Sequence, residues 1–139
     1  MAQKMQFYLV APERRLASVA VDAVQIPATD GDLTAMADHA PLITTLRPGI
    51  LRVQGGEGAA ETAYFVTGGF ADVAGPSVTV LAEQALPVSE VTTELMEGFI
   101  AEARAAHDKA RAADATNPAV NVAAKRLADL EAAKAQLAG

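Results

Sequence analysis

Apolar and polar residues alternate along the first part of the chain, from about residue 5 to residue 85. Met5, Phe7 and Leu9 fall on one side of an extended chain. Gln6 and Tyr8 fall on the other side. A period of two is typical of a strand that buries one face and leaves the other in water. The pattern therefore predicts that the chain begins with a half-buried strand.

The alternation changes phase between Val21 and Val24. Val21 belongs to the first phase, whereas Val24 and Ile26 belong to the opposite one. Because a shift of one residue moves side chains to the other face of a sheet, the second phase would leave the core. A bulge or kink near Asp22–Ala23 would return both residues to the buried side.

Three further apolar runs have the length and composition of strands. The runs are residues 50–53, 63–67 and 77–81. They are separated by turns, which are residues 54–58, Gly68–Gly69 and Gly75–Pro76. The paired glycines lack the basic residues of a phosphate-binding loop, so we interpret them as hairpin turns that need positive φ. Short strands at this spacing predict an all-β sandwich or barrel.

The period becomes helical after Pro87. Ser89 is predicted to cap a first helix, with Glu90 in the first turn, where an acid interacts favourably with the helix dipole. The apolar stripe of this helix consists of Val91, Leu95, Phe99, Ala103, Ala106 and Ala110. We expect the helix to end within residues 113–117.

A second helix is predicted to begin at Pro118, with Asn117 as its N-cap. Its apolar stripe consists of Val120, Ala123, Leu127, Leu130 and Leu137. Two helices of roughly 20 to 25 residues joined by a short loop lie antiparallel. The sequence thus predicts an all-β sandwich domain at residues 1–86 and a helical hairpin at residues 87–139.

The charge and the hydropathy of the chain limit its partners. The formal net charge of the 139 residues is −6 at pH 7. A surface for nucleic acid needs clustered lysine and arginine, so we expect no nucleic-acid partner. No segment approaches the roughly 18 consecutive apolar residues of a membrane span, so we expect no direct membrane insertion.

Candidate catalytic groups are few and scattered. The serines and histidines are Ser18, Ser77, Ser89, His39 and His107. No serine lies in a nucleophile context, and two histidines in different domains cannot form a two-histidine metal site. We therefore expect no catalytic residue, metal or cofactor. His107 is interpreted as a surface residue of the first helix, and Arg104 and Asp108 as a solvated i, i+4 pair.

A set of short motifs resembles one protein family. The motifs are Pro27; Asp30, Gly31, Asp32 and Leu33; His39, Ala40, Pro41 and Leu42; and Leu46, Arg47, Pro48 and Gly49. Further matches are Ala11–Pro12, Gly68–Phe70 and Val78–Glu83. In this order they resemble the epsilon subunit of the F-type ATP synthase, and they cover the β domain from end to end.

The resemblance implies a sandwich of about ten strands followed by the helical hairpin. It implies a non-catalytic rotor subunit of the central stalk that binds the gamma subunit and the c-ring and couples proton flow to ATP synthesis. Such a subunit lies at the cytoplasmic face of the bacterial inner membrane. By resemblance, the loop of Asp30, Gly31, Asp32 and Leu33 contacts the c-ring, with Asp32 as the acidic contact residue. The corner of His39, Ala40, Pro41 and Leu42 lies beside the same surface.

The hairpin leaves alternatives open. In some family members it extends toward the alpha and beta subunits and blocks ATP hydrolysis, and in some it binds ATP. The second helix of this chain has few basic residues, which favours a hairpin that is held down by default. The residues that match the ATP motif are Ile100, Arg104 and Ala105, but Ala101 stands where the motif has Asp. Because the missing carboxylate is a hydrogen-bond acceptor for the nucleotide, we expect no ATP binding. An ATP-sensing regulatory module remains the alternative, and a small sandwich enzyme is a third class, disfavoured by the missing catalytic groups.

Overall fold

A computed structural model describes residues 4–37, 39–55 and 62–138 of the chain. The chain divides into two compact units, residues 1–89 and 90–139. Within the described residues, the first unit holds all the strands and the second holds both α-helices. None of the described helices is both long enough and apolar enough to cross a bilayer.

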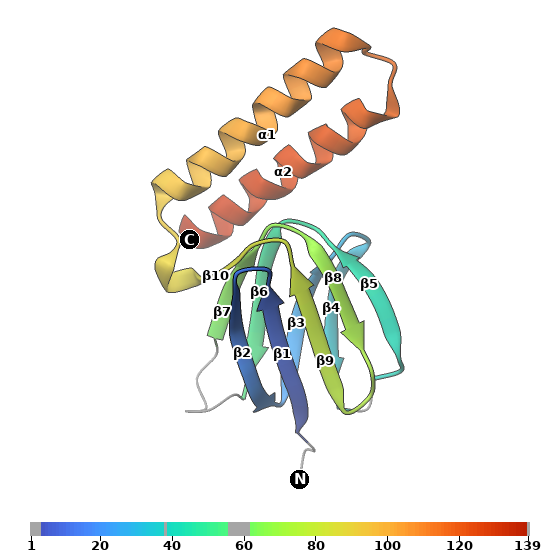
Figure 1. Ribbon diagram of the computed structural model, residues 1–139, viewed down its shortest axis with the longest axis vertical. Coiled ribbons are helices and arrows are strands. Elements are labelled where there is room, and N and C mark those ends of the chain that lie inside the picture. The colour runs from blue at the N-terminus through green and yellow to red at the C-terminus, as the bar shows by residue number, and fades with distance from the viewer. Residues whose placement is uncertain (1–3, 38, 56–61, 139) are drawn as a thin grey trace. The chain divides into compact units, whose positions relative to one another are not determined.

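The first unit contains ten strands among its described residues (Figure 1). They are β1 (Met5–Ala11), β2 (Arg14–Val21), β3 (Ala23–Ala28), β4 (Gly31–Met36), β5 (Leu42–Leu46), β6 (Gly49–Gln54), β7 (Thr62–Val66), β8 (Gly69–Val73), β9 (Ser77–Ala82) and β10 (Ala85–Pro87). A short 3-10 turn, η1 (Val88–Glu90), follows β10. The prediction of a sandwich with about ten strands is confirmed.

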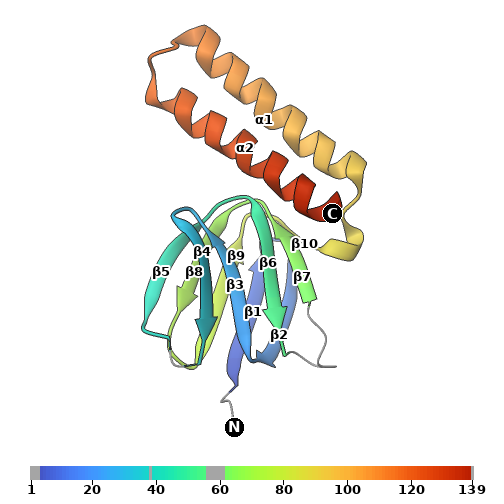
Figure 2. The ribbon, with the colours of Figure 1, turned by 180° about the vertical axis from the view of Figure 1, so that it is seen from behind.

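The strands form one hydrogen-bonded path that folds into two layers. The order is β10-β7-β6-β3-β5-β8-β9-β1-β2, and β4 pairs with β3 off this path. One layer holds β2, β1, β9 and β8, and the other holds β7, β6, β3 and β4, as Figures 1 and 2 show from opposite sides. The layers meet at a corner where β3 and β5 share a single pair, Ala28 with Leu46.

In β1 the buried face follows the alternation in the sequence. Met5, Phe7 and Leu9 are fully buried between the layers. Val24 and Ile26 are also fully buried, because Asp22 forms a bend between β2 and β3. The predicted kink is therefore confirmed.

The predicted runs at 50–53, 63–67 and 77–81 correspond to β6, β7 and β9. The glycine turns differ in kind. Gly75 has φ +67 and lies in the hairpin between β8 and β9. Gly68 and Gly69 have φ +150 and +130, but they connect β7 to β8, which are not paired with each other. The hairpin interpretation of Gly68–Gly69 is therefore wrong, and part of the predicted turn at 54–58 lies outside the described residues.

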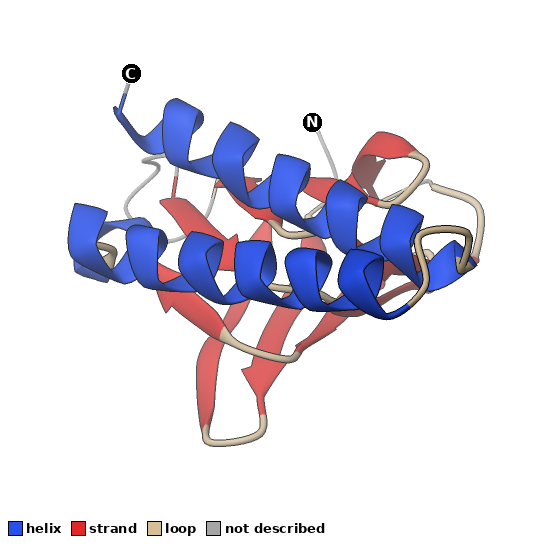
Figure 3. Cartoon of the chain, turned by 90° about the horizontal axis from the view of Figure 1, so that it is seen from above, coloured by secondary structure: helices blue, strands red, loops and turns tan. Residues whose placement is uncertain are grey.

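The second unit is an antiparallel pair of helices, α1 (Thr93–Ala113) and α2 (Pro118–Ala138), which Figure 3 shows side by side in blue. The N-cap of α1 is Thr92 and not Ser89, because Ser89 lies within η1. The hydroxyl of Thr92 accepts a hydrogen bond from the Leu95 amide at 3.1 Å. The predicted cap of α2 is confirmed, since the Asn117 side chain accepts from the Ala119 amide at 2.9 Å.

The loop between the helices is closed by Asp114. Its carboxylate accepts hydrogen bonds from the Thr116 amide at 3.0 Å and from the Thr116 hydroxyl at 2.7 Å. These two hydrogen bonds favour the ionised form and hold the pKa of Asp114 below its ordinary value of 3.8. Asp114 is therefore the C-cap of α1, within the segment 113–117 where the sequence predicted that the helix ends.

The buried side of α1 is displaced from the predicted stripe. Met96, Ile100 and Ala103 are its buried residues, and of these only Ala103 belongs to the predicted stripe. The predicted Leu95 is 36% exposed. The side chain of His107 is only 20% exposed, so its interpretation as a plain surface residue is wrong. In α2, the predicted Leu130 is buried at 1% exposure.

Ion pairs join the two helices across the hairpin. Lys134 lies 3.2 Å from Glu97, and Arg104 lies 3.6 Å from Glu131. Arg104 therefore pairs with the other helix and not with Asp108, as the sequence had suggested. Exposed pairs such as these contribute about 0.2 to 1 kcal/mol each, so they fix the register of the helices more than they stabilise them.

Candidate functional site

The acidic motif forms the turn between β3 and β4. Thr29 and Asp30 make the turn, and Gly31 begins β4 with φ +130. Asp30, Gly31 and Asp32 are exposed. Leu33 is partly buried and packs against the core, so its side chain anchors the turn. Of the four predicted contact residues, only the first three offer a surface to a partner.

Arg47 braces this turn from the motif that follows β5. Its guanidinium donates to the carboxylate of Asp32 at 2.5 Å and to the carbonyl of Ala28 at 2.6 Å. Its backbone amide donates to the carbonyl of Pro27 at 2.9 Å. Arginine is suited to this task because its planar fork holds two acceptors in a fixed geometry. We call Asp30, Gly31 and Asp32, together with Arg47, the braced acidic turn.

A close approach between backbone segments explains two other residues of the motifs. A Cβ atom at Gly49 would lie 2.8 Å from the Cβ of Pro27, which is too close for any residue other than glycine. The amide of Thr29 also donates to the carbonyl of Thr45 at 2.9 Å. Motifs that are separate in the sequence are therefore one structural unit at the corner of the sandwich.

The charge of the braced acidic turn is only partly neutralised. The Asp32 side chain remains 50% exposed although it pairs with Arg47. Asp30 is exposed and has no ion-pair partner within the described part of the chain. The carboxylates of Asp30 and Asp32 and the guanidinium of Arg47 together leave the braced acidic turn with a net negative charge.

The second predicted motif lies between β4 and β5. The backbone amide of His39 donates to the carbonyl of Met36 at 2.9 Å. Its imidazole Nδ1 lies 2.7 Å from the carbonyl oxygen of Ala40. Ala40 and Pro41 are exposed, and Leu42 is 39% exposed. His39 thus shapes this corner, and the following residues form its surface.

Sequence reasoning missed a group of apolar side chains on the outer face of one layer. In the strand register, Val10 lies beside Leu81, which lies beside Phe70. Two residues away along the same strands, a second cross-strand row consists of Tyr8, Thr79, Asp72 and Ile43, in that order. The two apolar residues of this row, Tyr8 and Ile43, lie at its ends. We call the apolar members the apolar band: Tyr8, Val10, Ile43, Phe70 and Leu81. A signal was present in three of the strands, because Tyr8, Val10, Phe70 and Leu81 occupy the outward phase of the alternation, where polar side chains are the norm.

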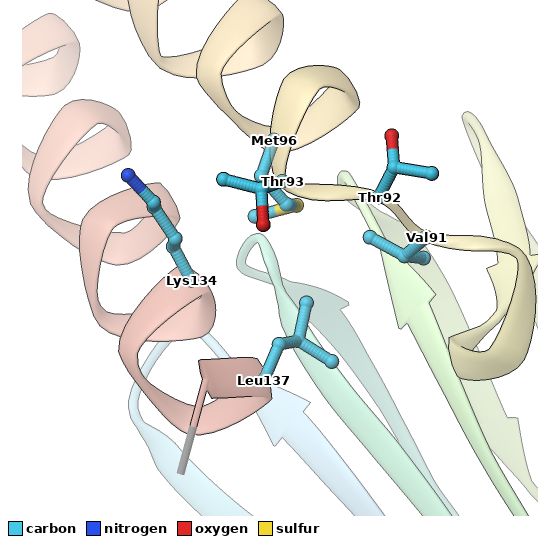
Figure 4. A pocket seen from close by; sticks show the side chains of 6 residues that line it. All are labelled: Val91, Thr92, Thr93, Met96, Lys134 and Leu137. Carbon is cyan, nitrogen blue, oxygen red and sulfur yellow. The ribbon is translucent and has the colours of Figure 1, made fainter.

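The ATP-motif residues Ile100 and Arg104 lie in different environments on α1. Ile100 is buried at 7% exposure, and the exposed Arg104 is paired with Glu131. A pocket of about 160 Å³ lies near the start of α1 (Figure 4). It is lined by Val91, Thr92, Thr93, Met96, Lys134 and Leu137. Ile100 and Arg104 do not line it.

No cluster of three or more potential metal-ligating side chains occurs within residues 4–37, 39–55 and 62–138. The features that the structure presents are two surfaces on the β-sandwich, the braced acidic turn and the apolar band. Surfaces of this kind suit contact with other proteins.

Comparison with known proteins identifies the class to which this sandwich belongs. Residues 4–88 match the family described as "ATP synthase, Delta/Epsilon chain, beta-sandwich domain". Among solved structures, the chain is similar to one in the mitochondrial ATP synthase of Euglena gracilis, in an assembly described as OSCP/F1/c-ring. The identity is 28%, the TM-score is 0.68, and the match covers 94% of this chain and 81% of the other.

Curated relatives narrow this class to one subunit. The ATP synthase epsilon chain of Jannaschia sp. is 60% identical over 126 residues, which are 91% of this chain and 90% of the relative. The epsilon chain of Rhodobacter capsulatus is 54% identical over 133 residues, which are 95% of each chain. The chain belongs to the ATP synthase epsilon chain family.

Proposed function

We infer that the chain is a non-catalytic subunit of the central stalk of a proton-translocating F-type ATP synthase. In this role it links the c-ring to the gamma subunit and couples proton flow to ATP synthesis. Membership of the epsilon chain family supports this function, and so does the similarity to a chain of the Euglena assembly. The subunit would associate with the cytoplasmic face of the bacterial inner membrane through its partners.

The braced acidic turn is the observation that carries this proposal. A contact that transmits rotation must hold its shape, and Arg47 fixes the turn through Asp32 and the Ala28 carbonyl. The negative tip would meet a basic loop of the c-ring. Such a charge contact sets the orientation of the partners more than it supplies affinity.

A charge reversal at the tip tests the c-ring contact. Asp30→Lys reverses an exposed charge and leaves the Asp32–Arg47 pair intact, whereas Asp32→Lys reverses the charge and also breaks that pair. Replacing one exposed attraction by a repulsion costs about 1 to 2 kcal/mol at the contact. We expect both variants to lower ATP-driven proton pumping per ATP hydrolysed in inverted membrane vesicles.

The matched control is Glu13→Lys, which makes the same charge change at another exposed turn residue. It should leave coupling unchanged. Wild-type coupling in both Asp30→Lys and Asp32→Lys would remove the role of this turn. The assay uses the complete enzyme, so a loss of assembly is detected separately by the amount of chain retained on the membranes.

The hairpin favours a second, regulatory function in the same complex. It is a compact unit with its own caps and its own ion pairs between helices. In this proposal it extends toward the alpha and beta subunits and limits ATP hydrolysis. A chain that ends at Ser89 keeps β10 and η1 up to the unit boundary. Higher ATPase activity of the complex with this shorter chain supports regulation, and unchanged activity refutes it.

A further inference from the structure

A cleft opens between the two layers of the sandwich, on the side where β2 and β7 lie (Figures 1 and 2). β2 is one end of the strand path and β7 is next to the other end, and the two strands are not paired with each other. The cleft has a volume of about 270 Å³. Its inner lining includes Phe7, Ala17, Val19, Val53, Thr62 and Tyr64.

The strand register directs these side chains into the cleft. Residues paired across antiparallel strands place their side chains on the same face of the sheet. In one layer, Val19 is paired with the fully buried Phe7. In the other layer, Tyr64 is paired with the fully buried Leu51. Val19 and Tyr64 therefore approach the space between the layers from opposite sides.

The floor of the cleft is apolar, and its polar groups lie along one strand. Phe7 is 0% exposed and Val53 is 3% exposed. Thr62 and Tyr64 are two residues apart on β7, so both hydroxyl groups belong to the same face. Within the described residues, the Tyr64 hydroxyl has no hydrogen-bond partner. Burial raises the pKa of Tyr64, so its phenol is neutral and free to donate.

We propose that this cleft binds a small neutral molecule that combines an aromatic ring with a carbonyl group. The ring packs on Phe7 and Val53, and the carbonyl oxygen accepts a hydrogen bond from Tyr64. A cavity of about 150 Å³ in another protein holds benzene, so the cleft has room for a substituted ring. A charged ligand is disfavoured because none of the lining residues carries a charge that would compensate its desolvation.

This site goes beyond the proposed function and is separate from the surfaces described above. The cleft shares no lining residue with the braced acidic turn or the apolar band. The acidic turn lies near the corner where β3 meets β5, in the middle of the strand path, whereas the cleft lies where the path ends. The ligand therefore binds to the isolated chain, and its binding is tested without any partner.

Acetophenone is the probe, and cumene is a molecule of similar shape that lacks the carbonyl oxygen. Each is titrated into the full chain labelled with nitrogen-15, and the amide signals of Ala17, Val19 and Tyr64 are followed by NMR. Tyr64→Phe removes the hydroxyl and keeps the ring. We expect this variant to bind acetophenone about fivefold more weakly and cumene as the wild-type chain does, because only the carbonyl uses the hydroxyl.

Two further variants locate the site. Ala17→Leu places a larger side chain in the cleft and should weaken the binding of both probes at least about tenfold. Phe70→Thr is the control, because it removes a large apolar side chain from the apolar band, where Phe70 is 58% exposed. It should bind both probes like the wild-type chain. The amide spectrum of each variant also shows whether it is folded.

The outcomes decide the inference without reference to the stalk. Saturable shifts at Ala17, Val19 and Tyr64 together with the loss in Tyr64→Phe support it. Equal affinity of the wild-type chain and Tyr64→Phe for acetophenone refutes the assigned hydrogen bond, and shifts confined to Phe70 and Leu81 refute the location. If neither probe binds, the cleft holds only water and the inference fails, while the proposed function stands on its own tests.

Discussion

Gly69 offers a sharp test of how closely β8 packs against β9. Its φ of +130 lies in a region that residues with a side chain rarely adopt. A Cβ atom there would lie 2.1 Å from the carbonyl oxygen of Leu81 and 2.9 Å from the Cα of Ala82. Both atoms belong to the backbone of β9, so no side chain can rotate away. Gly69→Ala must therefore push β8 and β9 apart at this end.

A second glycine separates backbone strain from steric overlap. Gly31 has the same φ of +130, but a Cβ atom there meets nothing within 4 Å. Gly31→Ala should cost only the strain, about 1 to 3 kcal/mol. Gly69→Ala should cost this strain plus about 2 kcal/mol more, because it disturbs roughly two ladder hydrogen bonds between β8 and β9. The total of about 3 to 5 kcal/mol reaches the lower end of the stability of a domain, which is about 5 to 15 kcal/mol.

Tyrosine fluorescence makes the measurement specific to the sandwich. The chain has two tyrosines and no tryptophan, and Tyr8 and Tyr64 lie in β1 and β7. Urea unfolding followed by tyrosine emission therefore reports the first unit, while the ellipticity at 222 nm, a helix signal, reports mainly the second. Equal losses of unfolding free energy in Gly31→Ala and Gly69→Ala would show that overlap with β9 is not the reason for glycine at this position.

Three further predictions concern single contacts. Thr92→Ala should destabilise the hairpin by about 1 kcal/mol through loss of its N-cap, whereas Ser89→Ala should change it by less than about 0.5 kcal/mol, both followed by ellipticity at 222 nm. Arg47→Gln should lower sandwich stability by about 1 to 2 kcal/mol, measured by tyrosine emission, because Asp32 loses its ion pair and the Ala28 carbonyl its donor. Hydrogen bonds from Thr116 lower the pKa of Asp114 in the folded chain. Their stabilisation of the fold is therefore complete at a pH above the pKa of the unfolded chain, and it is lost as the pH falls through the lowered pKa of the folded chain. A carbon-13 NMR titration should show this lowered pKa, and Thr116→Val should raise it.

The strands that the sequence revealed are those with one clean buried face. In β1, the alternation of Phe7 and Tyr8 between core and solvent is complete, so local pattern was sufficient. In β5, Leu42 and Ile43 are both exposed, and the alternation that would mark a strand is absent. The helix cap was misplaced for a different reason. Ser89 and Thr92 are both good caps, but Ser89 lies within η1, so α1 begins only after Thr92.

The candidate site was predicted only in part because its contacts are distant in the sequence. The motifs indicated that Asp32 and Arg47 matter, but nothing local shows that the guanidinium reaches the carboxylate. That contact needs the corner at which Ala28 meets Leu46. The apolar band depends on strand order in the same way, since Ile43, Phe70 and Leu81 become neighbours only when β5, β8 and β9 pair.

The pairing of β1 with β9 also governs the order in which the chain can fold. The two strands run parallel, with Phe7 beside Val78, so β1 is synthesised well before β9 and its second edge stays unpaired until β9 is present. Contacts between such distant segments carry a large loop-closure cost and slow the folding reaction. During synthesis, β1 and β2 can form only an isolated ribbon, which is marginal in water. The sandwich can close only when β9 has emerged from the ribosome, and until then the free edge of β1 is open to incorrect pairing.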